Sequence, residues 1–240
     1  MKTVFLDFDG VLFDTLKEAY VLCRASYLGV DILSPVENEV YKLFYKYKFL
    51  VYNSWQYYYL MKILDEQRFR NDEDFISFYK ECLNNRNIIE EENFDKKYYE
   101  HRINMMKNYS RYWDSLEEPF PFFNGIKDLF EQKRIDIVIV SKKNKFAINK
   151  RLKQYGLNLE NDKIYAKEEL MGYSSKAEFM HEYMIQNNIA TSFFVDDNSN
   201  NLRPCNAYPE IEPLLAGWGN IAINEQGLTS DKILKILENN

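Results

Sequence analysis

The sequence has few cysteines, no surplus of basic charge and no long apolar run, and each shortage excludes a class of protein. Cys23, Cys82 and Cys205 lie far apart among 240 residues, so they predict neither a disulfide framework nor a paired metal site, and a reducing cytoplasmic compartment is the better expectation. The formal net charge is -6, whereas non-specific nucleic-acid binding requires a basic face. We therefore expect no nucleic-acid partner.

No stretch of the chain has the apolar length needed to cross a membrane or to direct secretion. A transmembrane helix needs about 18 or more consecutive apolar residues, and the sequence has no such run. At the amino terminus only Val4, Phe5 and Leu6 form an apolar run before Asp7, which is too short for a signal peptide. We therefore expect no membrane partner.

The sequence does contain enough apolar residues for a packed core. Hydrophobic residues make up 46% and charged residues 28%, as in globular rather than disordered proteins. Short apolar segments predict buried strands over 4–8, 135–140, 192–195 and 214–218. Apolar residues at helical spacing predict helices over 125–133, 144–155 and 175–186. This alternation predicts an α/β fold, a Rossmann-like three-layer sandwich with a parallel sheet.

A long segment, residues 15–118, interrupts this alternation. It has no convincing buried strand, and its apolar residues recur at helical spacing. We therefore predict an α/β core from residues 1–14 and 119–240, and an inserted all-helical domain over 15–118. The dense aromatic residues of 41–60 are expected mainly to fill the core of that domain rather than to stack on a substrate. His101 and Arg102 could face a ligand, but isolated residues of these types are usually surface groups.

Polar side chains follow three of the predicted strands, where the carboxyl ends of parallel strands gather ligands. They are Asp7 and Asp9, then Ser141, then Asp196, Asp197 and Asn201. Asp7 and Asp9 can point the same way if the strand persists, or a loop after Phe8 could aim them separately, and Gly10 lets the chain turn at once. Converging carboxylates repel one another without a cation, and Mg2+ is usual where phosphate is also bound. A single aspartate after a strand is more often a helix cap, but caps need not cluster at several strand ends.

Four segments resemble, in order and spacing, the motifs of the haloacid dehalogenase-like hydrolase superfamily. They are DFDGVLFDT (7–15), VIVSKKN (138–144), SSKAEF (174–179) and FFVDDNSNN (193–201). The first matches its motif in full, and the fourth has the Asp-Asp-x-x-x-Asn form. The resemblance points to the phosphatase branch, and the helical insertion falls where members carry a cap domain after the first strand.

The resemblance implies a role for each residue. Asp7 would be the nucleophile that forms an aspartyl-phosphate, and Asp9 would protonate the leaving alkoxide and then activate water. Ser141 and the backbone amides near Lys142 would bind the phosphoryl oxygens. Lys176 would pair with Asp7 and with the phosphate.

The resemblance also implies a Mg2+ site. The Asp7 carboxylate, the Asp9 backbone carbonyl and Asp197 would hold the ion. Asp196 and Asn201 would be further ligands or would orient metal-bound water.

The lysine of the third motif, the residue after Ser141 and the role of Gly10 each need a further remark. Lys167, in YAKEEL, competes with Lys176 as the lysine of the third motif. Lys142 stands where asparagine is common in the family, which matters little if its backbone makes the contact. Gly10 is counted among the phosphate-binding residues.

Three rival functions were weighed against a phosphatase acting on a small phosphorylated metabolite. A dehalogenase would use Asp7 but would need neither an acid at position 9 nor Mg2+. A phosphomutase would share every catalytic residue, so only its product would separate it. A catalytically silent binding protein would be expected to lack one of the acids, and all are present. Substrate specificity is expected to reside in the inserted domain, whose sequence does not reveal it.

Overall fold

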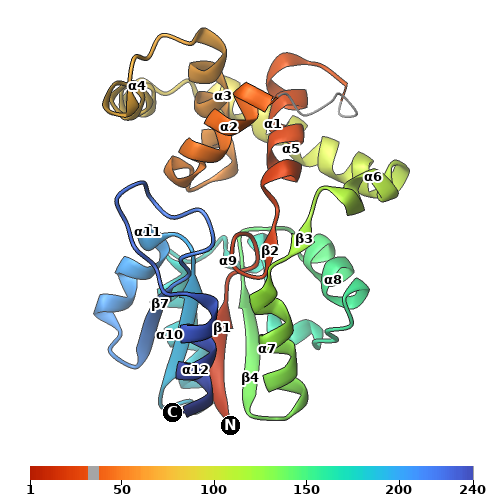
Figure 1. Ribbon diagram of the computed structural model, residues 1–240, viewed down its shortest axis with the longest axis vertical. Coiled ribbons are helices and arrows are strands. Elements are labelled where there is room, and N and C mark those ends of the chain that lie inside the picture. The colour runs from red at the N-terminus through yellow and green to blue at the C-terminus, as the bar shows by residue number, and fades with distance from the viewer. Residues whose placement is uncertain (32–37, 240) are drawn as a thin grey trace. The chain divides into compact units, whose positions relative to one another are not determined.

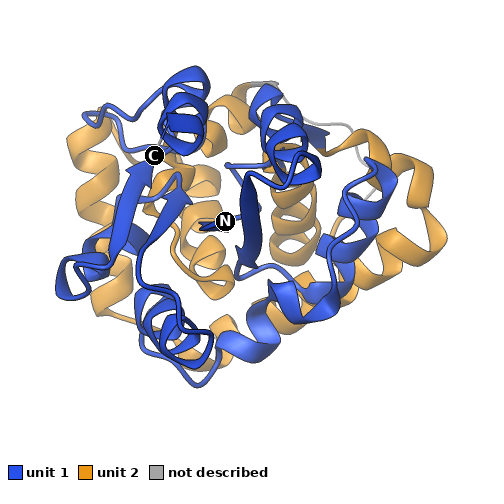
Figure 2. Cartoon of the chain, turned by 90° about the horizontal axis from the view of Figure 1, so that it is seen from below, with its two compact units in different colours: residues 1–14, 118–240 blue, residues 15–117 orange. Residues whose placement is uncertain are grey.

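The computed structural model describes residues 1–31 and 38–239. The chain divides into two compact units (Figures 1 and 2), a core unit of residues 1–14 and 118–240 and a helical unit of residues 15–117. The sequence analysis placed the second boundary one residue later. Residues 32–37 of the predicted helical insertion lie outside the described residues.

A five-stranded parallel sheet forms the centre of the core unit, as predicted. Its strands lie in the order β5-β4-β1-β6-β7, and every pairing in this sheet is parallel. The strands are β1 (Lys2–Leu6), β4 (Ile135–Val140), β5 (Ile164–Tyr165), β6 (Ser192–Asp196) and β7 (Ile211–Leu215). The predicted end of the first strand at Phe8 is wrong, because the ladder pairing of β1 ends at Leu6. The last strand begins and ends three residues earlier than predicted.

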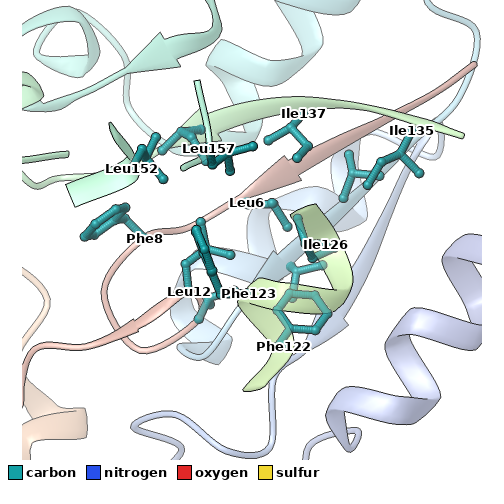
Figure 3. Packing of buried hydrophobic residues seen from close by; sticks show 14 of the residues in the cluster. Leu6, Phe8, Leu12, Phe122, Phe123, Ile126, Ile135, Ile137, Leu152 and Leu157 are labelled. Carbon is teal, nitrogen blue, oxygen red and sulfur yellow. The ribbon is translucent and has the colours of Figure 1, made fainter. Parts of the chain in front are cut away.

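The central strands are buried on both faces, which explains their continuous apolar sequences. Val4 and Leu6 of β1 lie in one hydrophobic cluster, and Phe5 lies in the other. Figure 3 shows the first cluster, where Leu6 of β1 lies beside Ile126 of an adjacent helix. Val4 and Leu6 face one cluster and Phe5 faces the other because successive side chains of a strand point to opposite faces of the sheet.

Helices cover both faces of the sheet and produce the three layers. α7 (Pro121–Glu131), α8 (Lys145–Gln154) and α12 (Ser230–Asn239) contribute to the first cluster. α10 (Lys176–Gln186) and α11 (Ser199–Leu202) contribute to the second. Pro121 begins α7, where its missing N–H costs nothing.

Two short strands mark where the chain leaves and re-enters the core unit. β2 (Phe13–Asp14) pairs antiparallel with β3 (Glu118–Pro119). The short helix α9 (Lys167–Leu170) follows β5. The sequence analysis did not predict these elements, β5 or α12.

The helical unit contains α1 (Leu16–Leu28), α2 (Asn38–Tyr47), α3 (Tyr57–Glu66), α4 (Asp72–Asn84), α5 (Ile88–Asn108) and α6 (Ser110–Ser115). Its core is largely aromatic: Phe44, Tyr47, Tyr57 and Tyr59 are buried, whereas Tyr45 is exposed. The expectation that the aromatic residues of 41–60 fill the core therefore holds for these four, whereas the other six aromatic side chains of that segment are partly or fully exposed. Among the described residues, no helix is both long enough and apolar enough to span a membrane.

The expectation that Arg102 is a surface group is wrong. Its side chain is buried in the helical unit and forms two hydrogen bonds with the buried carboxylate of Glu18, Nε to Oε1 at 2.8 Å and Nη2 to Oε2 at 3.1 Å. Isolated charges are indeed usually exposed, but a paired arginine can lie in the interior. Arg102 is thus part of the framework of its own unit.

Candidate active site

Three carboxylates converge at the carboxyl ends of the central strands. Asp7 directly follows β1, Asp196 is the last residue of β6, and Asp197 comes next. One carboxylate oxygen from each of the three lies within 4.8 Å of the others, and all three residues are buried. The edge of a parallel sheet beside its central strand is where ligands bind in such folds. The structure therefore brings Asp7, Asp196 and Asp197 together, as the sequence predicted.

Asp7 is held by its own loop and by a lysine. Its Oδ1 accepts a hydrogen bond from the backbone N–H of Phe8 at 2.7 Å, and the Lys176 Nζ lies 2.9 Å from its Oδ2. Burial raises the pKa of Asp7 to about 6, Lys176 opposes this rise, and the nearby Asp196 adds to it. The ionised form that a nucleophile requires is therefore less favoured than in a free carboxyl group, and a bound cation would stabilise it.

Lys176 begins α10 and joins two of the acids. Its Nζ lies 2.8 Å from Asp196 Oδ2 in addition to its contact with Asp7. Burial by itself lowers the pKa of Lys176, but the two carboxylates outweigh it and raise that pKa above the ordinary value. The two carboxylates therefore favour the charged form of Lys176.

Asn201 lies beside Asp196 and completes the polar cluster. Its Nδ2 donates to both carboxylate oxygens of Asp196, at 3.0 and 2.9 Å. The backbone N–H of Asn198 donates to Asp196 Oδ1 at 2.8 Å. The buried Asn201 Oδ1 accepts no hydrogen bond from any described residue, so this acceptor suits a water molecule or another bound donor.

The loop that follows β7 fixes Asp197, and the sequence analysis missed its role. The backbone N–H and the side-chain Nδ2 of Asn220 both donate to Asp197 Oδ2, at 2.7 and 3.0 Å. Trp218 Nε1 donates to the backbone oxygen of Val11 at 3.0 Å. The segment GWGN (217–220) overlaps the end of the predicted strand 214–218 and was the available signal, but Gly219 appeared only to close that strand.

Gly10 allows Asp197 to approach the loop that follows β1. It has a φ of +80°, and a Cβ at this position would lie 1.9 Å from Asp197 Oδ2. Its N–H donates to the Phe13 oxygen at 2.9 Å, so the amide of Gly10 is already used within the loop. The contribution of Gly10 is therefore space and backbone conformation rather than a hydrogen bond to phosphate.

Ser141 and the two lysines that follow it come directly after β4. Ser141 is buried, and its Oγ accepts from the Lys143 N–H at 3.3 Å. Burial and the neighbouring Lys176 lower the pKa of Lys142 to about 7, while Asp7 and Asp196 oppose the fall. These residues contribute the positive and hydrogen-bonding side of the site.

Asp9 and Lys167 have surroundings different from those of Asp7. The Asp9 Oδ1 lies 3.1 Å from the Nζ of Lys143, a residue that the sequence analysis did not identify. Lys167 begins α9, and its backbone N–H donates to the Lys143 oxygen at 3.1 Å. Among the described residues, the lysine that contacts both Asp7 and Asp196 is Lys176, so the geometry favours it over Lys167 for the third motif.

The cluster is suited to a divalent cation. One carboxylate oxygen from each of three acids lies within 4.8 Å of the others, and Lys176 contacts two of these acids, Asp7 and Asp196. Carboxylate and amide oxygens are the hard ligands that Mg2+ prefers, and the Asn201 Oδ1 adds an acceptor for a water of its hydration shell. A cation would also relieve the repulsion that burial intensifies between the acids.

Comparison with solved structures identifies the fold. No protein-family model matches the sequence, and no curated protein sequence does either. A predicted phosphoglycolate phosphatase from Haemophilus somnus is 12% identical, with a TM-score of 0.62 over 98% of this chain and 97% of that one. A hydrolase of the haloacid dehalogenase-like family from Streptococcus pneumoniae is 16% identical, with a TM-score of 0.56 over 98% of both chains. A protein provisionally named a β-phosphoglucomutase, from Thermotoga maritima, is 15% identical, with a TM-score of 0.55 over 99% of both chains. The chain therefore has the haloacid dehalogenase-like fold.

Proposed function

We propose that this protein is a Mg2+-dependent phosphohydrolase of the haloacid dehalogenase-like superfamily that cleaves a small phosphate monoester. The observation that carries the proposal is the buried cluster in which Lys176 contacts both Asp7 and Asp196, with Asp197 alongside. The names of the similar structures, a predicted phosphoglycolate phosphatase and a β-phosphoglucomutase, support phosphoryl chemistry on small organic molecules.

The reaction takes two displacements at phosphorus. In the first, an oxygen of Asp7 forms a bond to phosphorus while the bond to the leaving oxygen breaks, and Asp9 gives that oxygen a proton. In the second, Asp9 accepts a proton from water as the water oxygen bonds to phosphorus and the Asp7–phosphorus bond breaks. Ser141 and the Lys142 amide hold the phosphoryl oxygens, and Lys176 offsets their charge.

The cation, when bound, reduces the repulsion between the anionic nucleophile and the anionic phosphate. The Asp7 carboxylate, the Asp9 backbone carbonyl and Asp197 would hold it, because they supply hard oxygen ligands. Asp196 and Asn201 would orient its water. Asn220 fixes Asp197 through two hydrogen bonds, which is the kind of support that tunes metal affinity.

Phosphate release from a panel of phosphorylated metabolites tests the proposal. We expect the purified protein to release phosphate from one or a few related monoesters with Mg2+, to stop when a chelator is in excess, and to resume when Mg2+ is restored. Full activity in excess chelator would contradict the metal role. A phosphomutase shares every residue named above, so an isomerised product without net phosphate release would replace the hydrolase assignment.

Substitution of the two candidate lysines tests the third motif. Lys176→Met should lower kcat/KM by about 10²–10³-fold, as removal of one transition-state donor typically does. Lys167→Met should change it by less than about 3-fold, because no transition-state contact is lost. Steady-state kinetics with saturating Mg2+ measure both, and thermal unfolding checks that each variant is folded. The opposite ranking would place the third motif at Lys167.

A further inference from the structure

We infer that Lys143 is a positioning residue for Asp9, holding that carboxylate where it can transfer a proton to and from the reacting oxygens. The inference rests on the proposed function and extends it to a residue with no assigned role. Lys143 lies in the loop after β4, whereas Asp9 lies in the loop after β1, so the pair joins two neighbouring strand ends.

The geometry of Lys143 is that of a buried and anchored cation. Its Nζ lies 3.1 Å from Asp9 Oδ1, and the lysine side chain has no exposed surface, whereas 32% of the Asp9 side chain is exposed. The Lys143 backbone is fixed as well, since its N–H donates to Ser141 Oγ and its oxygen accepts from the Lys167 N–H. A lysine is almost never fully buried unless it is paired, and Asp9 is the partner that Lys143 contacts. Removing the Lys143 ammonium would leave the end of the Asp9 side chain without this contact.

Asp9 needs such support because of where it lies. Its strand ends three residues earlier, at Leu6, and its backbone retains an isolated bridge to Phe13. A partly exposed carboxylate in a loop can adopt several rotamers. Proton transfer requires a separation of about 2.6–3.2 Å between the heavy atoms, and a misplacement of about 1 Å can cost roughly 100-fold in rate. The fixed ammonium of Lys143 restricts Asp9 to the rotamers that keep this contact.

A leaving-group comparison distinguishes this role from a merely structural one. An alkyl phosphate needs a proton on its departing oxygen, whereas p-nitrophenyl phosphate releases a stable phenolate without one. The value of kcat/KM reports steps up to the departure of that group. With saturating Mg2+, Lys143→Met should lower kcat/KM by about 10–100-fold for the alkyl phosphate identified by the panel, and by less than about 3-fold for p-nitrophenyl phosphate, whose departure needs no proton.

Two further variants complete the experiment. In an Asp9→Asn background, Lys143→Met should add no further loss on the alkyl phosphate, because the two residues act as one unit. Lys145→Met is the matched control: it removes a neighbouring lysine whose Nζ lies 2.6 Å from Glu169 Oε1, and both substrates should react as with the wild type. If Lys143→Met does not fold, Lys143→Gln, which keeps a hydrogen-bond donor, is measured in the same way.

The outcomes separate the inference from the proposed function. Equal losses on both substrates, or a further loss in the Asp9→Asn background, would overturn the positioning role while wild-type turnover stands. A wild-type enzyme that turns over neither substrate would overturn the proposed function and this inference with it. Selective loss on the alkyl phosphate, absent when Asp9 is already replaced, is the result expected.

Discussion

Asp7→Asn is expected to abolish turnover while the protein remains folded. Asparagine keeps the shape of the side chain but cannot form an acyl phosphate, so the first displacement is lost. We expect kcat to fall by roughly 10⁴-fold or more, the scale seen when the nucleophile of an enzyme that uses covalent catalysis is removed.

The stability of the Asp7→Asn variant should not fall. The folded-state pKa of Asp7 is raised from 3.8 to about 6, chiefly by burial. A carboxyl whose pKa is higher in the folded than in the unfolded state makes the ionised protein less stable at pH values above both. At pH 7 a neutral side chain therefore removes an unfavourable buried charge, and the Tm without metal should stay level or rise. Such a gain on losing a catalytic group is common where a site is built for function.

Three measurements decide the outcome for Asp7. Phosphate release gives kcat, acid quenching with a radiolabelled substrate shows whether phosphate is attached to residue 7, and thermal unfolding shows that the fold persists. Asp136→Asn is the control, because it removes a carboxylate whose Oδ2 lies 2.6 Å from the Lys163 Nζ, at the start of β4 and away from the strand ends that carry the cluster. Near-normal turnover by Asp7→Asn would exclude Asp7 as the nucleophile.

The sequence predicted the site residues that directly follow or end a buried strand. The apolar strands are separated by helices, so they had to form a parallel sheet, and polar residues at their carboxyl ends had to meet. Asp7, Ser141 and Asp196 follow this rule. The strand order and the lengths of β1 and β7 required the structure, because ladder pairing rather than the apolar pattern determines where a strand ends. β5 has two residues, which is too few for any periodicity to reveal.

The supporting residues could not be predicted in the same way. Asn220 lies 23 positions from Asp197, and Lys143 lies 134 positions from Asp9. Neither residue type is informative alone, since an asparagine after a glycine suggests a turn and a lysine beside a lysine suggests a solvated surface. Their roles arise only when the sheet brings the loops together. The role of Gly219 could not be predicted either. A Cβ at this position would lie 2.3 Å from the Gly10 oxygen, and only the structure shows that these two backbones approach so closely.

Arg102→Met is expected to produce the largest loss of stability in the helical unit. The substitution leaves the Glu18 carboxylate, which has no exposed surface, without its guanidinium partner. Trp113 Nε1, at 3.0 Å from Glu18 Oε1, would remain as a neutral donor and could not balance the charge. Breaking a buried pair by removing one partner costs about 3–5 kcal/mol in the free energy of unfolding. Urea unfolding of the wild type and the variant measures the difference.

A second substitution shows whether the loss comes from charge or from packing. Glu18→Gln combined with Arg102→Met keeps an acceptor for Trp113 but leaves no buried charge, so it should recover more than half of the lost stability. Lys96→Met, on α5 like Arg102, is the matched control. The Lys96 Nζ lies 4.0 Å from Glu100 Oε1, and the two side chains are 75% and 62% exposed. Loss of this exposed pair should cost under about 1 kcal/mol in the free energy of unfolding. If the double variant is as unstable as Arg102→Met, the arginine stabilises α5 through its packed stem and its hydrogen bond to Tyr98 rather than through charge balance with Glu18.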